Sequence, residues 1–262
     1  MSAERTTSLP LAGAASRTAP HDATPGATQA APGSLPIAET FVSVQGEGRL
    51  AGVPSWFVRT SGCNLRCAWC DTPYASWRPE GSARTIDDLV REARASGVRH
   101  AVVTGGEPMI FEPIAALCAA LRDAGLHVTI ETAGTVWRGV HADLMSISPK
   151  LANSTPAPEQ GGAWAQRHEA RRIDLDALQR LIDAHPERQL KFVVAAPTDL
   201  AEIEALLARL HNWRNEDVLL MPEGVTPEAL AARAWVVEAC VERGWRYCPR
   251  LHIELFGNTR GT

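Results

Sequence analysis

Three cysteines within eight residues form the most chemically specific pattern in the sequence. Cys63, Cys67 and Cys70 have C-x3-C-x2-C spacing and directly follow the apolar run 56–60. Thiolates are soft ligands that match iron, and a short loop with three of them suits three irons of a [4Fe–4S] cubane. The fourth iron then has no ligand from this loop. Open coordination predicts a site that chelates a small molecule, because a simple electron carrier needs no open position.

A structural zinc site is the alternative interpretation of these cysteines. Zinc usually takes four ligands in two closely spaced pairs, and the sequence has no second C-x2-C and no H-x3-5-H pair. The other cysteines, Cys118, Cys240 and Cys248, lie in apolar or terminal segments and are interpreted as small buried hydrophobes. This distribution favours metal ligation over disulfides and predicts the reducing cytoplasm as the compartment.

A second motif follows the next predicted strand. It reads Thr104-Gly105-Gly106-Glu107-Pro108, and its glycines let backbone groups approach a ligand closely. Together with the cysteine loop it resembles the GGEP motif of radical S-adenosylmethionine enzymes, which contacts the methionine amino group. The resemblance implies that S-adenosylmethionine chelates the open iron, and that one electron from the reduced cluster cleaves the cofactor to methionine and a 5′-deoxyadenosyl radical.

The flanking motifs resemble those of 7-carboxy-7-deazaguanine synthases. In order they are ETFVSVQGEG at 39–48, FVRTSGC at 57–63, CDT at 70–72, ETAGT at 131–135 and SPK at 148–150, so they cover most of residues 37–150 and more loosely the remainder. The resemblance implies a carbon–nitrogen lyase that converts 6-carboxy-5,6,7,8-tetrahydropterin to 7-carboxy-7-deazaguanine with loss of ammonia, on the route to queuosine and related 7-deazapurines. It also implies magnesium as a further cofactor.

The same resemblance implies roles for individual residues. The predicted catalytic group is the three cluster cysteines and Arg59, whose planar fork would pair with the substrate carboxylate. Substrate contacts are expected from Val44, Gln45, Gly46, Arg59, Thr104 and Glu131. S-adenosylmethionine contacts are expected from Trp69, Cys70, Asp71, Gly105, Gly106, Glu107, Ser148, Pro149 and Lys150. Thr72 would give Mg2+ one oxygen, since this ion often keeps water and borrows ligands from substrate.

Taken singly, these residues have ordinary structural interpretations. Arg59 could be a solvated strand residue, Thr72 a helix cap, Gln45 part of a turn and Glu131 a surface carboxylate. Their shared order with the cysteine loop favours function. Lys191, on an apolar run, either points into the barrel or snorkels from its rim. Many members of the family carry a Thr-His-Lys segment near the C-terminus, whereas this chain has a different ending, so the resemblance assigns no contact to His252.

The elements that must position these residues alternate between strand and helix patterns. Strands are predicted at 55–60, 100–104, 127–131, 144–148, 190–194 and 218–221, and helices at 113–124, 175–184, 200–210 and 227–243, with a capping box at Thr85 before another helix. Residues 152–162 are predicted to form a long loop. Six such units predict a partial (β/α)6 TIM-like barrel of the radical S-adenosylmethionine type. Residues 1–34 predict a disordered tail, and 35–262 one catalytic domain.

Composition narrows the partners. The formal net charge of −4 disfavours a general nucleic-acid or membrane surface, and no apolar run is long enough to span a bilayer, so a small-molecule pterin substrate is expected. The resemblance implies a homodimer and a reductase such as flavodoxin or ferredoxin as electron donor.

Two other functions stay open: a glycyl-radical-enzyme activase, which shares the cysteine spacing, and an interaction protein that binds a cluster or zinc without catalysis.

Overall fold

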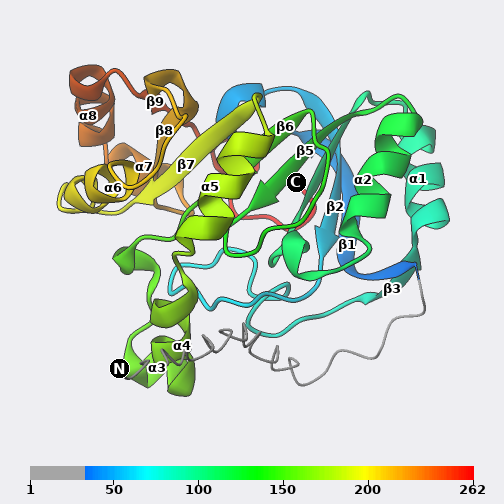
Figure 1. The fold of residues 1–262 in the computed structure, drawn as a ribbon, viewed down its shortest axis with the longest axis horizontal. Helices are drawn as coiled ribbons and strands as arrows, with labels where there is room; N and C mark the ends of the chain where they lie inside the picture. Colours follow the sequence, from blue (N-terminus) through cyan, green and yellow to red (C-terminus); the bar gives the residue numbers. More distant parts are fainter. Residues whose placement is uncertain (1–32) are drawn as a thin grey trace, which may run out of the picture.

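Six parallel strands form the centre of the protein, and all the connections between them except β5–β6 contain helices (Figure 1). The computed structural model describes residues 33–262, and all six strands predicted from the sequence are present. They are β2 (Pro54–Thr60), β4 (His100–Gly105), β5 (His127–Thr132), β6 (Leu144–Ile147), β7 (Arg188–Val194) and β8 (Val218–Pro222). Their order in the sheet follows their order in the chain, so all their carboxyl ends meet at one edge.

Three further strands extend the sheet beyond the prediction. β1 (Ser34–Val44) pairs antiparallel with β2, β3 (Ser82–Thr85) pairs antiparallel with β1, and the short β9 (Arg246–Tyr247) pairs with β8. Within residues 33–262 the order runs from β3 to β9 without those two edges pairing, which confirms a partial barrel. Ser34, assigned to the predicted tail, is the first residue of β1; residues 1–32 of that tail lie outside the described residues.

Helices cover the outer face of this sheet and bury a single large core against it. They include α1 (Ile86–Ala95), α2 (Ile114–Asp123), α5 (Leu175–Ala184) and α6 (Asp199–Leu207), and α1, α2 and α5 lie together on one side of the strands in Figure 1. Leu117 and Leu181 from the helices and Val103 from the sheet are fully buried in this core. The cap predicted at Thr85 is confirmed, since its side chain accepts a hydrogen bond from the Asp88 amide at 3.2 Å.

The helix predicted over 227–243 is wrong as one element. It is α7 (Pro227–Ala231) followed by a turn and α8 (Trp235–Arg243). In one continuous helix, Val237 would lie two turns after the buried Leu230 and on the same face. Val237 is exposed, however, and its neighbour Val236 is buried instead. The turn rotates the buried face so that both helices pack against the core.

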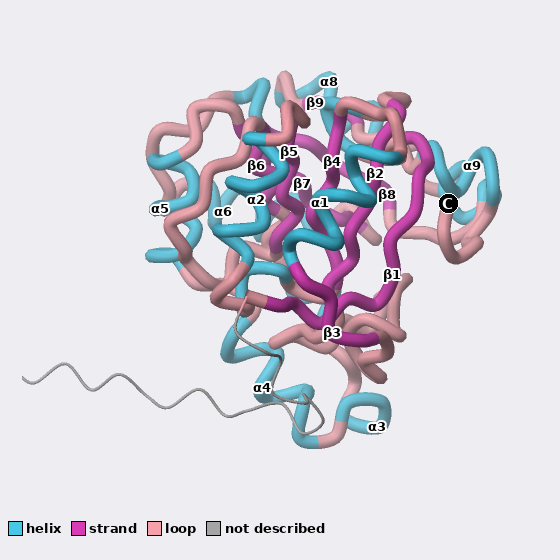
Figure 2. Tube along the Cα trace, turned by 90° about the vertical axis from the view of Figure 1, so that its right-hand side faces the viewer, coloured by secondary structure: helices cyan, strands magenta, loops and turns pink. Residues whose placement is uncertain are grey.

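The loop predicted at 152–162 contains helical turns and leads into an unpredicted helix. η3 (Ala152–Ser154) and α3 (Pro158–Gly161) precede α4 (Ala163–Arg171), and Figures 1 and 2 both show α3 and α4 extending beyond the lower edge of the sheet. The remaining short elements are η1 (Gly48–Leu50), η2 (Pro108–Ile110), η4 (Asn215–Asp217) and α9 (Leu251–Phe256).

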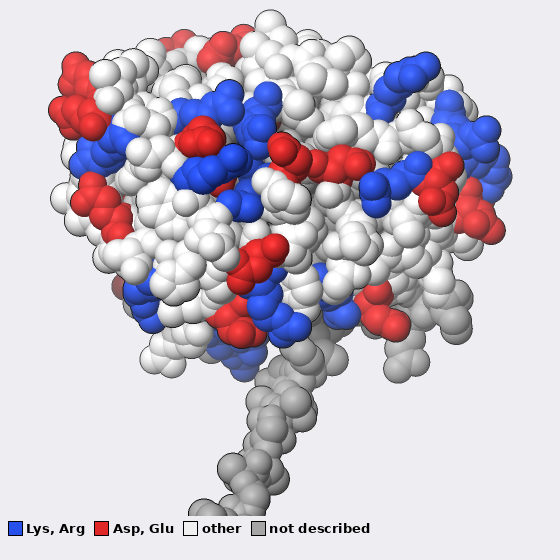
Figure 3. All heavy atoms as spheres, turned by 45° about the horizontal axis from the view of Figure 1, so that its top comes forward, with Lys and Arg blue, Asp and Glu red and all other residues white. Residues whose placement is uncertain are grey.

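Two surface observations complete the fold. In the part of the chain that the structure describes, no helix is both long and apolar enough to cross a bilayer. On the face drawn in Figure 3, Lys and Arg side chains lie interspersed with Asp and Glu, so that face presents mixed charge.

Candidate active site

The cysteine loop leaves the carboxyl end of β2 and is clamped to the turn that follows β4. The Gly62 amide donates to the Ala75 carbonyl at 2.8 Å, and the Glu107 amide donates to the Gly62 carbonyl at 2.9 Å. A β-carbon at Gly106 would lie 2.1 Å from the Gly62 carbonyl oxygen, so only glycine permits this approach. Gly105 and Gly106 line the site, but close packing of Gly105 against Thr60 at the end of β2 and of Gly106 against the cysteine loop already requires both to lack a side chain.

The three loop cysteines form a donor set that suits a cubane cluster. All three thiols are free and close enough to interact electrostatically. Burial raises the pKa of Cys67 to about 12, with Lys150 opposing the shift and Cys70 adding to it, so the thiol needs a bound cation before it ionises. No three ligating side chains among residues 33–262 close around a single metal ion. Three free thiols on one short loop are the donor set that a [4Fe–4S] cluster with one open iron takes.

A cavity of about 460 Å3 opens beside this loop at the carboxyl ends of the strands. The structure brings thirteen of the predicted site residues into its wall: Val44, Gln45, Gly46, Arg59, Trp69, Asp71, Thr72, Thr104, Gly105, Gly106, Glu131, Ser148 and Lys150. Among the described residues, the wall does not include Cys63, Cys67, Cys70, Glu107 or Pro149.

The Glu107 carboxylate has a different environment from the one predicted. It is fully buried and accepts hydrogen bonds from the Met109 amide (3.0 Å), the Thr132 hydroxyl (2.7 Å) and the Ala133 amide (2.7 Å). The side chain thus ties the turn after β4 to the end of β5 and does not face the cavity. The carboxylate therefore supports the turn after β4, and a direct contact of Glu107 with S-adenosylmethionine stays a prediction.

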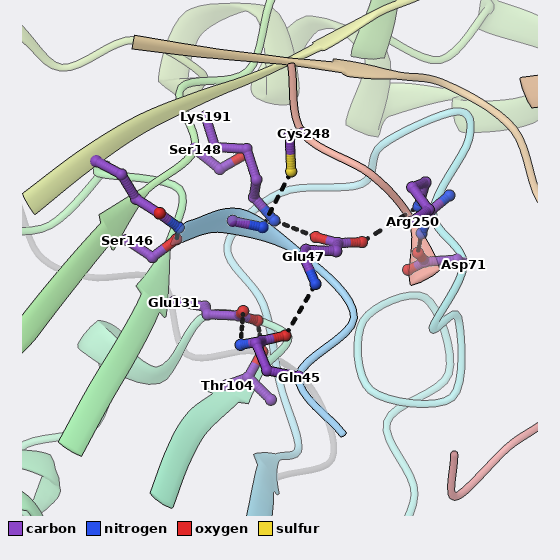
Figure 4. A network of polar contacts seen from close by, with 12 residues as sticks. Gln45, Glu47, Asp71, Thr104, Glu131, Ser146, Ser148, Lys191, Cys248 and Arg250 are labelled. Atoms are coloured by element: carbon purple, nitrogen blue, oxygen red, sulfur yellow. Dashed lines mark hydrogen bonds and ion pairs between the residues drawn. The ribbon is translucent and has the colours of Figure 1, made fainter. Parts of the chain in front are cut away.

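Arg59, Thr104 and Glu131 come from three successive strands and form a row along the cavity wall. Arg59 is in register with Thr104, and the β4–β5 pairing places Glu131 beside Thr104. Thr104 Oγ1 donates to Glu131 Oε2 at 2.8 Å, and Gln45 Nε2 donates to Glu131 Oε1 at 3.1 Å (Figure 4). The row therefore presents a cation at one end and a carboxylate with two accepting oxygens at the other.

Arg59 is oriented by groups on β1 and on the cysteine loop's continuation. Its Nε donates to Glu39 Oε1 at 2.7 Å, and Tyr74 donates to the same oxygen at 2.8 Å. The guanidinium lies 5.8 Å from the centre of the Phe41 ring. Since the Nε bond uses one of five N–H donors, the remaining donors of the fork are available for an anion in the cavity.

Sequence reasoning missed an ion network in the cavity wall, which Glu47, Asp71 and Lys191 all line. Lys191 pairs with Glu47 Oε2, while Arg250 Nε lies 3.2 Å from Glu47 Oε1 and its Nη2 pairs with Asp71 (Figure 4). Lys191 is only 5% exposed, so it points into the barrel. Cys248, expected to be a simple core residue, accepts from the Gly48 amide at 3.0 Å in the same region.

The charges of this network fix its protonation. Burial alone would raise the pKa of Glu47, but Lys191 and Arg250 hold it well below its ordinary value. Burial alone would lower the pKa of Lys191, but Glu47 and Glu131 hold it above its ordinary value. Both groups are therefore charged near neutral pH. A lone lysine on an apolar strand was the one signal that could have revealed a buried counter-ion.

Three of the predicted cofactor residues are held together in the cavity wall. Lys150 Nζ donates to Ser148 Oγ at 2.8 Å and lies 5.6 Å from the centre of the Trp69 ring. Trp69 Nε1 in turn donates to the Asn153 carbonyl at 3.1 Å. Residues from the cysteine loop and from the segment after β6 are thus held together.

The C-terminal segment closes part of the cavity, a contribution that the sequence left open. His252 and residues 258–262 line the wall. Arg260 Nε lies 3.0 Å from Glu39 Oε2, Arg260 Nη1 lies 2.9 Å from Glu80 Oε2, and the guanidinium stacks 4.0 Å from the centre of the Tyr74 ring. The segment is therefore held against the same groups that orient Arg59.

The spacing of the cysteine loop and its place at the carboxyl edge of a partial barrel are those of a radical S-adenosylmethionine enzyme. The chain matches the Radical SAM superfamily model over residues 57–149. Over 240 residues it is 50% identical to 7-carboxy-7-deazaguanine synthase of Rhodopirellula baltica, covering 91% of this chain and 93% of the relative. It is 47% identical to that of Halobacterium salinarum, covering 87% and 93%. The chain belongs to the 7-carboxy-7-deazaguanine synthase family.

A solved structure agrees with this assignment. The crystal structure of QueE from Escherichia coli superposes with a TM-score of 0.63 at 28% identity, covering 84% of this chain and 95% of that chain. Membership of a synthase family excludes the two alternative functions that the sequence left open, a glycyl-radical-enzyme activase and an interaction protein without catalysis. The radical S-adenosylmethionine class implies a [4Fe–4S] cluster and S-adenosylmethionine as cofactors.

Proposed function

We propose that this chain converts 6-carboxy-5,6,7,8-tetrahydropterin to 7-carboxy-7-deazaguanine with release of ammonia, acting as a carbon–nitrogen lyase. The observation that carries the proposal is the row of Arg59, Thr104 and Glu131 along a cavity that borders the cysteine loop. A cation at one end and a paired-oxygen acceptor at the other match a pterin that has a carboxylate on one side and an N–H edge on the other.

Glu131 holds the guanidine-like edge of the pterin in this proposal. Its two oxygens accept hydrogen bonds from Gln45 and Thr104 (Figure 4). A planar edge with adjacent N–H donors bonds both oxygens, and Gln45 and Thr104 keep the carboxylate from rotating. Arg59, aligned by Glu39 and Phe41, pairs with the substrate carboxylate through its free donors.

The cofactor is assigned to other residues of the same cavity wall. Trp69, Asp71, Gly106, Ser148 and Lys150 would hold S-adenosylmethionine, with Cys63, Cys67 and Cys70 holding the cluster. When bound, the cluster and S-adenosylmethionine supply a one-electron reductive cleavage that yields a carbon radical. The protein's part is to hold the substrate at a fixed place beside that chemistry and to exclude water.

Thr72 is the proposed protein ligand of Mg2+. It lines the cavity, while the neighbouring Asp71 carboxylate is already paired with Arg250. The ion would therefore take one hydroxyl from the chain and complete its coordination with substrate carboxylate and water. Replacing Thr72 with valine removes that oxygen at nearly constant volume and should raise the Mg2+ concentration needed for half-maximal activity.

The wider setting is part of the same proposal. We assign the electron donor to a flavodoxin or ferredoxin, the assembly to a homodimer and the compartment to the cytoplasm. The three free loop thiols support the compartment alone, because they require reducing conditions to stay available for iron.

The test is a product assay on anaerobically reconstituted protein. Carboxytetrahydropterin, S-adenosylmethionine, Mg2+ and dithionite are added, and both 5′-deoxyadenosine and carboxydeazaguanine are measured by mass spectrometry. We expect carboxydeazaguanine to form. Cleavage of S-adenosylmethionine without any carboxydeazaguanine would contradict the proposed substrate while leaving the cofactor class intact.

A further inference from the structure

Arg66 is a buried cation in the middle of the cysteine loop. The residue is only 4% exposed. Its Nη1 donates to the Cys63 carbonyl at 2.8 Å and to the Leu65 carbonyl at 2.7 Å. Among residues 33–262 it forms no ion pair with a carboxylate within 4.0 Å. A buried guanidinium without an anionic partner is costly, and arginine does not neutralise itself by losing its proton.

Helix α4 covers this guanidinium on the solvent side. The Trp164 ring stacks against it, with 4.2 Å from the guanidinium carbon to the ring centre. The Arg66 amide donates to His168 Nδ1 at 3.1 Å, and His168 Nε2 lies 2.9 Å from Ser154 Oγ. His168 is fully buried, and burial lowers its pKa to about 4, so it is neutral and adds no charge. Arg66 is therefore the charged group that α4 holds in place.

With a cluster bound, the thiolates of Cys63, Cys67 and Cys70 would supply the missing anionic partner. Arg66 Nη1 is bonded to the Cys63 carbonyl at 2.8 Å, and Cys67 is the next residue in the chain, so the guanidinium lies beside the cluster cysteines; burial lowers the pKa of Arg66, and these cysteines oppose that shift. A cubane with three thiolates carries net negative charge, and more of it after reduction. Lys150 also interacts with Cys67, but it lines the cavity in the proposed cofactor site, whereas Arg66 lies outside that wall.

We propose that Arg66 is a positioning residue that raises the reduction potential of the cluster by holding a buried positive charge beside its thiolates. The proposal rests on ligation of the cluster by Cys63, Cys67 and Cys70. A fixed cation in a poorly screened environment stabilises the reduced, more negative cluster more than the oxidised one. The covering helix increases the effect, because Trp164 keeps water away from the guanidinium.

The test compares cluster potentials, which a purely structural role would not change. Anaerobically reconstituted wild type and Arg66→Gln, matched for iron and sulfide content, are titrated with dithionite and followed by electron paramagnetic resonance. Gln keeps a donor for the Cys63 carbonyl but loses the charge. We expect the ratio of reduced to oxidised cluster at a fixed applied potential to fall about tenfold, equivalent to a downward shift of about 60 mV for one electron.

Two further variants make the result specific. Arg167→Gln is the matched control, because Arg167 stacks on the same Trp164 ring at 5.5 Å but is exposed to solvent, and we expect its ratio to match the wild type. Arg66→Lys keeps the charge and should also keep the wild-type ratio. An unchanged ratio in fully loaded Arg66→Gln would overturn the proposal. If Arg66→Gln does not hold a cluster, a tenfold fall in Arg66→Lys would overturn it and an unchanged ratio would support it.

These readouts need no pterin and no product. A fall in the ratio with no carboxydeazaguanine in the product assay would leave the inference standing and contradict the proposed substrate. Carboxydeazaguanine formation with an unchanged ratio in Arg66→Gln would support the proposed substrate and contradict the inference about Arg66.

Discussion

The His252 ring packs against the α-carbon of Gly46. A β-carbon at position 46 would lie 2.0 Å from His252 Nδ1, so the loop after β1 and the C-terminal helix α9 meet with no space for a side chain. This contact joins the loop that carries Gln45 to the segment that closes the cavity, and it makes the shape of this part of the cavity sensitive to a single methyl group.

Gly46→Ala should therefore displace His252 and weaken substrate binding. We expect KM for carboxytetrahydropterin to rise at least fivefold with a smaller change in kcat, and overpacking to cost about 1–3 kcal/mol of unfolding free energy. Steady-state kinetics and thermal unfolding measure the two effects. Gly139→Ala is the control, because a β-carbon there meets nothing within 4 Å. Equal kinetics for the two variants would contradict the predicted contact.

Glu47→Gln should destabilise the protein strongly. The substitution leaves Lys191 and Arg250 buried without their shared carboxylate, and breaking a buried pair typically costs about 3–5 kcal/mol. Urea unfolding gives the change. Glu216→Gln removes an exposed partner of Arg214 and should cost less than about 1 kcal/mol. Similar losses in both variants would show that the network adds little stability.

The same carboxylate predicts how stability depends on acid. The folded-state pKa of Glu47 lies well below its ordinary value of 4.5, so its stabilising contribution is fully present above about pH 4.5 and is lost as the pH falls through the folded value. The difference in unfolding free energy between wild type and Glu47→Gln should be constant from pH 7 to 5 and shrink below 4.5. A difference that grows on acidification would have the wrong sign.

Glu131→Gln should reduce turnover without unfolding the protein. Replacing one accepting oxygen by an N–H group removes a hydrogen bond to a charged acceptor, worth about 1.5–3 kcal/mol, so kcat/KM should fall by about 10- to 100-fold. Initial rates of carboxydeazaguanine formation test this. Glu238→Gln, on an exposed position of α8, should leave kcat/KM unchanged. A fall below twofold in Glu131→Gln would remove Glu131 from the substrate site.

Local sequence signals were sufficient for the strands that carry the site. Short β-rich runs bounded by helix signals gave all six parallel strands, and the motif spacing placed Arg59, Thr104 and Glu131 at their carboxyl ends. The helix cap formed by Thr85 and the Asp88 amide joins residues only three positions apart, so it too was predictable.

Long-range pairings could not be read from the same signals. Arg250 meets Glu47 across 203 positions and Asp71 across 179, and no local pattern encodes such partners. The strand β1 was missed because its residues were interpreted only as a binding motif. Helix α4 was missed because it follows a Pro- and Gly-rich segment and has few buried positions.

The central claim is that Arg59 and Glu131 hold opposite ends of one pterin, and carboxylate selectivity tests it most directly. Affinities for carboxytetrahydropterin and for tetrahydropterin without the carboxyl group are measured by calorimetry in EDTA, so that no Mg2+ contacts the carboxylate, on wild type, Arg59→Gln and Glu131→Gln. We predict that wild type prefers the carboxylated ligand at least about tenfold, a difference of about 1.4 kcal/mol. Arg59→Gln should bring that ratio close to one, and Glu131→Gln should weaken both ligands equally. A preference that survives in Arg59→Gln would contradict the account.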